Sequence, residues 1–281
     1  MAMHQRALVG LIAIFVCLLP VPNSVASSAA GALDLDNGYR QMYDLNFSGA
    51  HQTFAQWETQ HPDDPLGPVS NAAAYLFAEF NRLKILEFDL FTQDQKFESR
   101  PKLSPKPDVR TAFDNELSKA DRIATAQLSR NPHDAHALFA QVLADGLRGD
   151  YTALIEKRDL AGLSYIKSAR GIAEKLLALD PTYYDAYLAV GTENYLLSLK
   201  PAPVRWILRL GGAQTNRDEG LSKLHLTADK GHYLAPYARL LLAVAALRDK
   251  DRNTARILLS GLWHEFPDNA LYKKELDRIQ P

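Results

Sequence analysis

The feature that most constrains the fold of this chain is a fixed distance between a small residue and a proline. Proline cannot continue a helix but is tolerated at the opening of the next one, and a small residue lets a neighbouring helix backbone come close. Recurrence of such a pair predicts a repeated unit built from two packed helices. The distance is twelve residues in each of four places, Ala50–Pro62, Ala120–Pro132, Ala169–Pro181 and Ala255–Pro267.

The unit is clearest in residues 165–199, where two segments with apolar periodicity flank Pro181. The spacings within each segment place its small and apolar residues on one stripe of a helix. We therefore expect two antiparallel helices that are joined by a tight turn and pack through their small residues. These residues are Ala169, Ala173 and Leu176 on the first helix, and Tyr187 and Gly191 on the second.

The rest of the chain also shows mainly helical periodicity, and we expect about ten to twelve helices. Residues at about 92–110 have three prolines and mixed charge without apolar periodicity, which predicts an exposed loop. A charged helix over 268–279 is typical of the cap of a helical stack. The other expected helices cover about 69–91, 111–129, 133–147 and 217–230, with short ones over 151–156 and 204–210.

In this pattern the chain resembles the tetratricopeptide repeat (TPR) family, whose repeats of about 34 residues are helix pairs. The repeat is degenerate, since the four prolines lie 70, 49 and 86 residues apart. The resemblance implies an all-α fold, a right-handed superhelical stack of antiparallel helix hairpins over residues 31–281. The first unit matches the family positions at Gly38, Ala50, Phe54, Trp57 and Pro62.

A shorter resemblance concerns the C-terminal part. It is similar to a segment of eukaryotic TPR proteins of the mitochondrial inclusion-body-clearance type. The residues that carry this likeness are Gly191–Tyr195, Val204–Arg205, Leu210–Gly212 and Arg217–Leu221.

Residues 1–30 are typical of a signal peptide. One firm positive charge, Arg6, precedes an apolar run from Ala7 to Leu19, which is shorter than the roughly twenty residues needed to cross a bilayer. Cleavage after Ala26 or Ala30 would satisfy the small-residue requirement of signal peptidase. We expect an exported protein, periplasmic or secreted, with an uncleaved N-terminal anchor as the alternative.

Cysteine usage and charge exclude several classes of function. Cys17 is the only cysteine and lies in the apolar run, so the processed chain has no disulfide and no thiolate metal site. Removal of residues 1–30 takes away Arg6, one of the 32 basic residues, and none of the 33 acidic ones, which leaves a net charge of −2. This balance does not favour nucleic acid as a partner.

No catalytic or cofactor motif is recognisable, and we predict no cofactor, no bound metal and no catalytic residue. His133 and His136 have a spacing that can supply two metal ligands, but without a third ligand we interpret them as structural. Gly211-Gly212 has no following lysine of a phosphate loop and predicts the end of a helix. An acid pair that forms only in the fold stays open.

The TPR resemblance implies a partner groove on the concave face. If the family geometry holds, Asp185, Thr192 and Tyr195 line this groove, and an aromatic residue with small polar neighbours suits peptide recognition. An apolar groove, or one filled by a folded-back terminus, is equally open. The function we predict is an exported interaction scaffold or adaptor that binds a peptide or protein partner. The alternative is a helical-repeat enzyme with a carboxylate or histidine site in the groove.

The segment Val204–Leu210, VRWILRL, has apolar residues with two arginines between them. One interpretation is a basic amphipathic helix for a membrane surface. Two turns are too short for independent membrane binding. We therefore favour a connecting helix whose apolar side covers the repeat stack.

Overall fold

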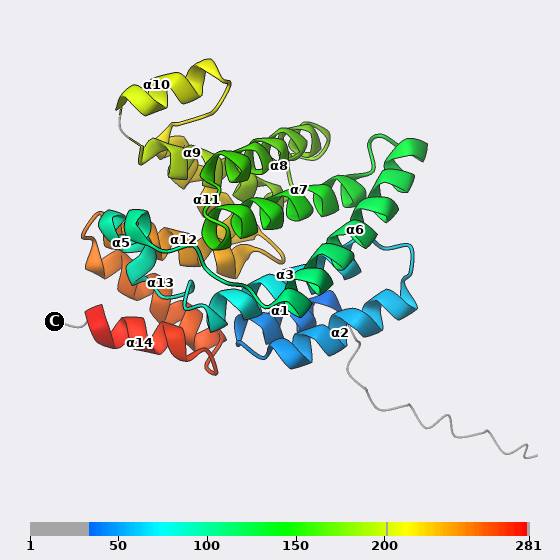
Figure 1. Cartoon of the computed structure of the whole chain (residues 1–281), viewed down its shortest axis with the longest axis horizontal. Helices are drawn as coiled ribbons and strands as arrows, with labels where there is room; N and C mark the ends of the chain where they lie inside the picture. Colours follow the sequence, from blue (N-terminus) through cyan, green and yellow to red (C-terminus); the bar gives the residue numbers. More distant parts are fainter. Residues whose placement is uncertain (1–33, 201, 280–281) are drawn as a thin grey trace, which may run out of the picture. The chain divides into compact units, whose positions relative to one another are not determined.

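The computed structural model describes residues 34–200 and 202–279, all within one compact unit, Leu33–Pro281. The predicted signal peptide, residues 1–30, lies outside the described residues. Within them the chain forms fourteen α-helices and no β-strand (Figure 1). None of these helices is long and apolar enough to cross a membrane. The predicted all-α class is confirmed.

Ten of the helices form five antiparallel hairpins, and an eleventh, α14, follows the last one. Three short helices, α4, α5 and α10, lie in the connections. The hairpins are α1 (Leu35–Tyr43) with α2 (Phe47–Gln60), α3 (Leu66–Arg82) with α6 (Pro107–Arg130), α7 (Ala135–Asp150) with α8 (Asp159–Leu179), α9 (Tyr187–Ser198) with α11 (Arg217–Lys230), and α12 (Ala235–Arg248) with α13 (Arg252–Glu265). The remaining elements are α4 (Asp89–Thr92), α5 (Asp94–Ser99), α10 (Ala202–Leu210), α14 (Ala270–Ile279), a π-helical turn (Tyr151–Ile155) and a 3₁₀ turn (Tyr184–Ala186).

Side-chain caps begin five of these helices. In each case a side-chain oxygen accepts a hydrogen bond from a backbone N–H of the first turn, which has no partner inside the helix. Such a cap typically stabilises a helix by about 1 kcal/mol. The capping residues are Asp34 (α1), Asn46 (α2), Asp134 (α7), Asn216 (α11) and Asp251 (α13).

The alanines that define the repeat all lie on the second helix of a hairpin and are almost completely buried, as their spacing predicts. The sequence pattern missed one copy. Helix α11 buries Gly220, Leu224 and Thr227 at the same spacings of four and three, but no proline stands twelve residues after Gly220. The four alanines are Ala50, Ala120, Ala169 and Ala255.

The prediction for residues 165–199 was wrong about which helices form a hairpin. Helix α8 packs mainly against α7, and α9 packs mainly against α11. A Cβ atom added at Gly191 would lie 3.0 Å from the carbonyl oxygen of Gly220, so this glycine allows close approach to α11. The turn at Pro181 therefore joins two successive hairpins.

Most described residues of the predicted loop at about 92–110 are exposed or half-buried, but the segment is not a plain loop. Helix α5 lies inside it, α6 begins within it, and Arg100 is buried. The Arg100 guanidinium donates to the carbonyl oxygen of Ala153 at 2.9 Å, and the backbone N–H of Lys106 donates to the buried carboxylate of Glu79 at 2.8 Å. These buried polar contacts hold the segment against the stack. The prolines and charged residues of this segment indicate only that it is not one continuous helix.

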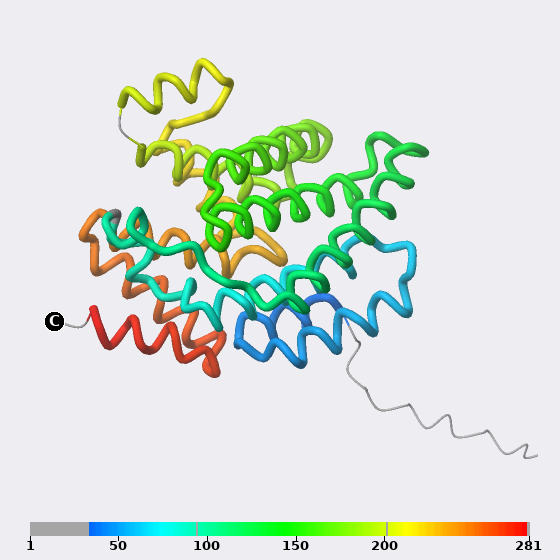
Figure 2. The backbone as a smooth tube through the Cα atoms, viewed as in Figure 1, coloured from blue at the N-terminus to red at the C-terminus, as the bar shows by residue number. Residues whose placement is uncertain are grey.

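The first and last hairpins contact each other, so the stack closes on itself (Figure 2). Asn269, before α14, donates to the carbonyl oxygen of Tyr43 in α1 at 2.8 Å. The Tyr43 hydroxyl donates to the carbonyl oxygen of Tyr233 at 2.9 Å, and His232 lies 2.6 Å from Asp36. The all-α solenoid of hairpins is confirmed, but its two ends do not stay apart.

Helix α14 is therefore not a free cap. Its charged residues reach the start of α4 and the chain before it: Lys274 pairs with Glu87 at 3.2 Å, and Arg278 pairs with Asp89. The charged outer face that is typical of a cap is exposed, and part of its charge also pairs with another part of the chain.

Candidate functional site

A narrow cavity, which we call the central crevice, lies between the first helices of the five hairpins. Its lining comes from α1, α3, α7, α9 with the preceding 3₁₀ turn, and α12, together with two residues of α8. The cavity volume is about 100 Å³. On such a scale one water needs about 10–15 Å³, so the crevice has room for several waters or for one apolar side chain of a ligand.

Most of the crevice wall is apolar and aromatic. The ring of Tyr237 meets Phe77 edge to face, with 5.6 Å between centroids, and Tyr39 stacks on Tyr233 at 4.7 Å. The Ser70 hydroxyl donates to the Tyr39 hydroxyl at 2.9 Å. Rings held by such contacts form a largely preformed wall, which is typical of a binding site.

Asp150 is the unusual residue of this wall. It is the last residue of α7, where the helix widens into the π-helical turn Tyr151–Ile155, and π-helical turns are frequent at functional sites. No hydrogen bond or ion pair reaches the Asp150 carboxyl group from any residue that the structure describes. Asp150 is half-buried, and its desolvation in the crevice wall raises its pKa from an ordinary 3.8 to about 7. Near neutral pH the group can therefore either donate or accept a proton.

The three predicted groove residues have different positions. Asp185 lines the crevice, but its carboxylate accepts the backbone N–H groups of Tyr233 at 3.1 Å and Leu234 at 3.0 Å, so it organises the start of α12. Thr192 lines the crevice, and among the described residues its buried Oγ1 has no hydrogen-bond partner. Tyr195 is outside the crevice, because it packs in a separate core cluster with Leu224.

The histidines have structural contacts. His136 lies 2.8 Å from the carboxylate of Asp64, and this hydrogen bond raises the pKa of His136. His133 is exposed, and its backbone N–H donates to the Asn131 side chain. Within residues 34–200 and 202–279, no group of three or more His, Cys, Asp or Glu side chains has a geometry that could hold a metal ion.

A second group of ionisable residues lies between α2, α3 and α6, and none of its members lines the crevice. The Glu58 carboxylate is 2.5 Å from Lys119 and accepts from Asn71 at 3.1 Å. Burial, followed by the nearby negative charge of Glu58, raises the pKa of Glu116 to about 7. This group joins three helices through its hydrogen bonds and ion pair.

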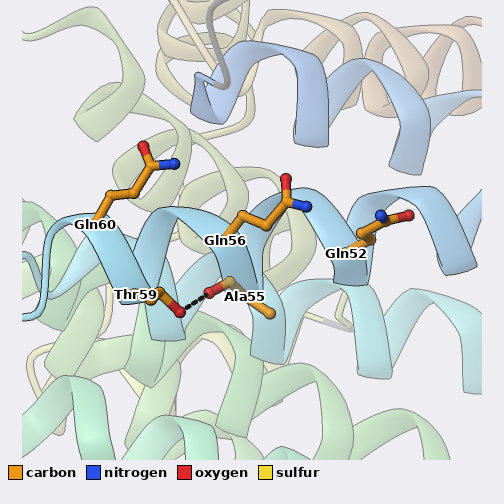
Figure 3. Close-up of a pocket in the computed structure, with 5 residues that line it drawn as sticks. All are labelled: Gln52, Ala55, Gln56, Thr59 and Gln60. Atoms are coloured by element: carbon orange, nitrogen blue, oxygen red, sulfur yellow. Dashed lines mark hydrogen bonds between the residues drawn. The ribbon is translucent and has the colours of Figure 1, made fainter.

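A shallow depression on α2 is the other hollow of note. All five residues around it come from that one helix, and its three glutamines follow each other at successive turns (Figure 3). A depression formed by a single helix surrounds no ligand. The residues are Gln52, Ala55, Gln56, Thr59 and Gln60.

The segment Val204–Leu210 forms α10, as predicted, and Gly212 follows its end with a positive φ of 78°. The interpretation of α10 as a cover for the stack is wrong, because none of its residues is buried. The side chains of Trp206, Ile207 and Leu210 lie in solvent.

Asp150 was missed by the sequence reasoning, although a signal was present. Leu143, Leu147 and Asp150 fall four and three residues apart, so the aspartate continues the apolar stripe of α7. An acidic residue in such a stripe indicates a carboxyl group that is turned inward.

Comparisons with known proteins establish no family for this chain. No family model matches the chain, and no curated protein matches it. The likeness to eukaryotic TPR proteins therefore stays a prediction. Among solved structures, the chain is similar to a thermophilic TPR protein from Thermus thermophilus, with 14% identity, a TM-score of 0.42, and coverage of 88% of this chain and 98% of that one. No function follows from a match at this level.

Proposed function

We propose that this chain is an exported helical-repeat adaptor that binds a protein or peptide partner in the central crevice. The observation that carries this proposal is the lining of the crevice. Rigid apolar and aromatic side chains of five hairpins surround one carboxyl group, Asp150, that no described residue neutralises. An apolar pocket with a few polar groups that fix orientation is the usual form of a binding site.

The size and charge of the crevice define the part of the partner that enters it. A volume of about 100 Å³ takes one large apolar side chain but no folded element. A hydrogen-bond donor next to that side chain, such as a backbone amide or an amine, would be the partner for Asp150 and Thr192. We therefore expect an exposed peptide segment with a single apolar anchor.

Gly146 offers a direct test because it lines the crevice and a Cβ atom added there meets nothing within 4 Å. Gly146→Leu should fill the cavity without disturbing the helices. Gly171→Leu is the matched control, since Gly171 also lies inside a helix with open space, but outside the crevice. Random peptides displayed on phage are selected on the natural chain, and their binding to both variants is then measured.

The selected peptides should share an apolar anchor, bind the Gly171→Leu variant normally and lose binding to Gly146→Leu. Peptides that bind both variants equally would place the binding surface elsewhere and contradict the proposal. Circular dichroism of both variants confirms that the helices are intact.

Export is proposed from the N-terminal sequence, where Arg6 and the apolar run Ala7–Leu19 precede a string of small residues. Expressed in a Gram-negative host, the protein should be recovered from the periplasm with a new N-terminus between Ser27 and Leu33. Recovery of a chain that begins at Met1 in the membrane fraction would favour the anchor instead.

A second candidate function is acid–base catalysis at Asp150. A carboxyl group with a pKa of about 7 in an apolar cavity is suited to transfer protons near neutral pH. Mass spectrometry of the selected peptides after incubation separates the two functions. Unchanged peptides support an adaptor, whereas a chemical change that Asp150→Asn abolishes supports an enzyme.

A further inference from the structure

Helix α10 presents an apolar face to solvent. Trp206 is 64% exposed, Ile207 62% and Leu210 70%. These residues fall on the same side of the helix as Pro203. Single exposed apolar residues are ordinary, but a contiguous apolar patch on one helix marks an interaction surface.

The opposite side of α10 attaches it to the rest of the protein. Arg205 donates to the carbonyl oxygen of Ser198 at 3.3 Å and to that of Lys200 at 2.9 Å, and Arg209 donates to the hydroxyl of Thr215 at 2.6 Å. The polar face of the amphipathic helix is therefore used for attachment. Its apolar face is left outward.

The turn after α10 is also fixed. Arg170 of α8 donates to the carbonyl oxygen of Gly212 at 3.1 Å, and Lys167 donates to that of Gly211. Arg170 is itself held by the completely buried carboxylate of Glu193, 2.7 Å away. A helix of two turns is unstable alone, but here the folded protein has already ordered it. The shortness of α10 is therefore no obstacle to membrane binding.

The charged residues in the segment around α10 are all basic. No acidic residue occurs between Glu193 and Asp218. Among the described residues, none forms an ion pair with Lys200, Arg205 or Arg209, which contact backbone and hydroxyl groups or solvent. Residues 194–217 are therefore positively charged, although the whole chain has a net charge of −1. Their complement is a negatively charged surface.

We propose that the exposed face of α10 docks on a lipid bilayer that contains anionic headgroups. Tryptophan is enriched at the headgroup level of membranes, and apolar side chains beside it enter the acyl boundary. Positive side chains near the interface are attracted by anionic lipids. This inference uses no residue of the central crevice and is independent of the proposed function.

The test measures tryptophan fluorescence of the full chain with vesicles of phosphatidylcholine and bromine-labelled phosphatidylglycerol. Bromine quenches a tryptophan only when the ring reaches the lipid. We expect quenching in the natural chain and its loss in Trp206→Phe. Trp57 and Trp263, the other two tryptophans, stay in both proteins and serve as internal controls. Replacing phosphatidylglycerol by phosphatidylcholine should weaken binding strongly.

Ile207→Ser supplies the energetic test. Removal of this side chain from the acyl boundary should weaken vesicle binding by about tenfold. Ile257→Ser is the matched control, because Ile257 is 72% exposed on α13 and should leave vesicle binding unchanged. The apolar run Ala7–Leu19 is present in every variant, so lipid binding by that run cannot produce the difference.

Three results would overturn the proposal. Quenching that persists in Trp206→Phe, or equal vesicle binding by both serine variants, would show that α10 stays off the lipid. A dimer in sedimentation experiments that Ile207→Ser dissociates would show that a second copy of the chain covers this face instead.

Discussion

The side-chain amide of Asn269 donates a hydrogen bond to the backbone carbonyl oxygen of Tyr43 at 2.8 Å, although 226 residues separate them in the chain. This buried contact joins the end of the last hairpin to the first helix. The Asn269 side-chain oxygen also accepts the backbone N–H of Leu271 at 3.0 Å and so supports the start of α14.

Asn269→Ala removes both contacts and leaves a carbonyl oxygen buried without a partner. We expect a loss of unfolding free energy of about 1–3 kcal/mol, seen as a lower urea midpoint. Asn253→Ala is the control, since Asn253 is exposed on α13 and its side chain accepts a hydrogen bond from Arg256. The unfolding free energy of this control should stay within about 0.5 kcal/mol of that of the natural chain. Equal midpoints would mean that the two ends of the stack separate in solution.

Ala255→Leu tests the alanine pattern. Ala255 is completely buried on α13, so three added carbons must displace close-packed atoms, which typically costs about 1–3 kcal/mol. Arg252→Leu, on an exposed position three residues earlier, should change stability by less than about 0.5 kcal/mol. If urea unfolding finds the two variants alike, Ala255 is not at a helix contact.

Gly220→Ala and Gly261→Ala should have opposite effects. A Cβ atom at Gly220 would lie 2.6 Å from the backbone nitrogen of Tyr195, so α9 and α11 must move apart, at a cost of about 1–3 kcal/mol. At Gly261, inside α13, nothing lies within 4 Å. Alanine there should stabilise the protein by about 0.4–1 kcal/mol, because it reduces the conformational entropy of the unfolded chain. Thermal unfolding shows whether each variant is more or less stable than the natural chain. Stabilisation by Gly220→Ala would contradict the close contact between α9 and α11.

Asp150→Asn should change the pH dependence of stability. Burial raises the pKa of Asp150 to about 7, so between pH 4 and 7 the unfolded chain releases this proton before the folded protein does. The stability that protonated Asp150 gives is complete below about pH 4 and is lost as the pH rises through 7.

The asparagine variant should therefore lose less stability than the natural chain between pH 5 and pH 8. Glu116 also has a pKa raised to about 7 and adds a slope of the same sign to both proteins. The measured quantity is thus the difference between their urea midpoints. Asp229→Asn, at an exposed position of α11, is the control and should behave as the natural chain does. An identical pH dependence in Asp150→Asn would mean that water solvates this carboxyl group.

The helices were predictable because their signals are local. The spacing of an alanine, an apolar residue and a proline indicates one buried stripe and one helix end. Both can be recognised in a window of about fifteen residues. The partner of a helix is not visible there. Pro181 marks where α8 stops, but Gly191 and Gly220 decide that α9 packs most closely on α11.

The candidate site was predictable only in part for a similar reason. Asp185 and Thr192 do line the crevice, but whether a carboxylate is available depends on residues far away, such as the backbone of Tyr233 and Leu234. The π-helical turn after Asp150 has no simple sequence signature. The exposure of α10 depends on contacts from α8 to the carbonyl oxygens of Gly211 and Gly212.

The contact between the first and last hairpins limits how this protein can change in length. An open array of repeats can gain or lose a terminal unit and uncover a single surface, and its stability is close to a sum over neighbours. Here the loss of α14 would uncover α1 and the chain before α4 as well as α13, and an added repeat would have to break the Asn269–Tyr43 contact. Arrays usually grow by duplication of a hairpin, and in this chain such a duplication would break the contact between the two ends. We expect the whole stack to unfold as one cooperative unit.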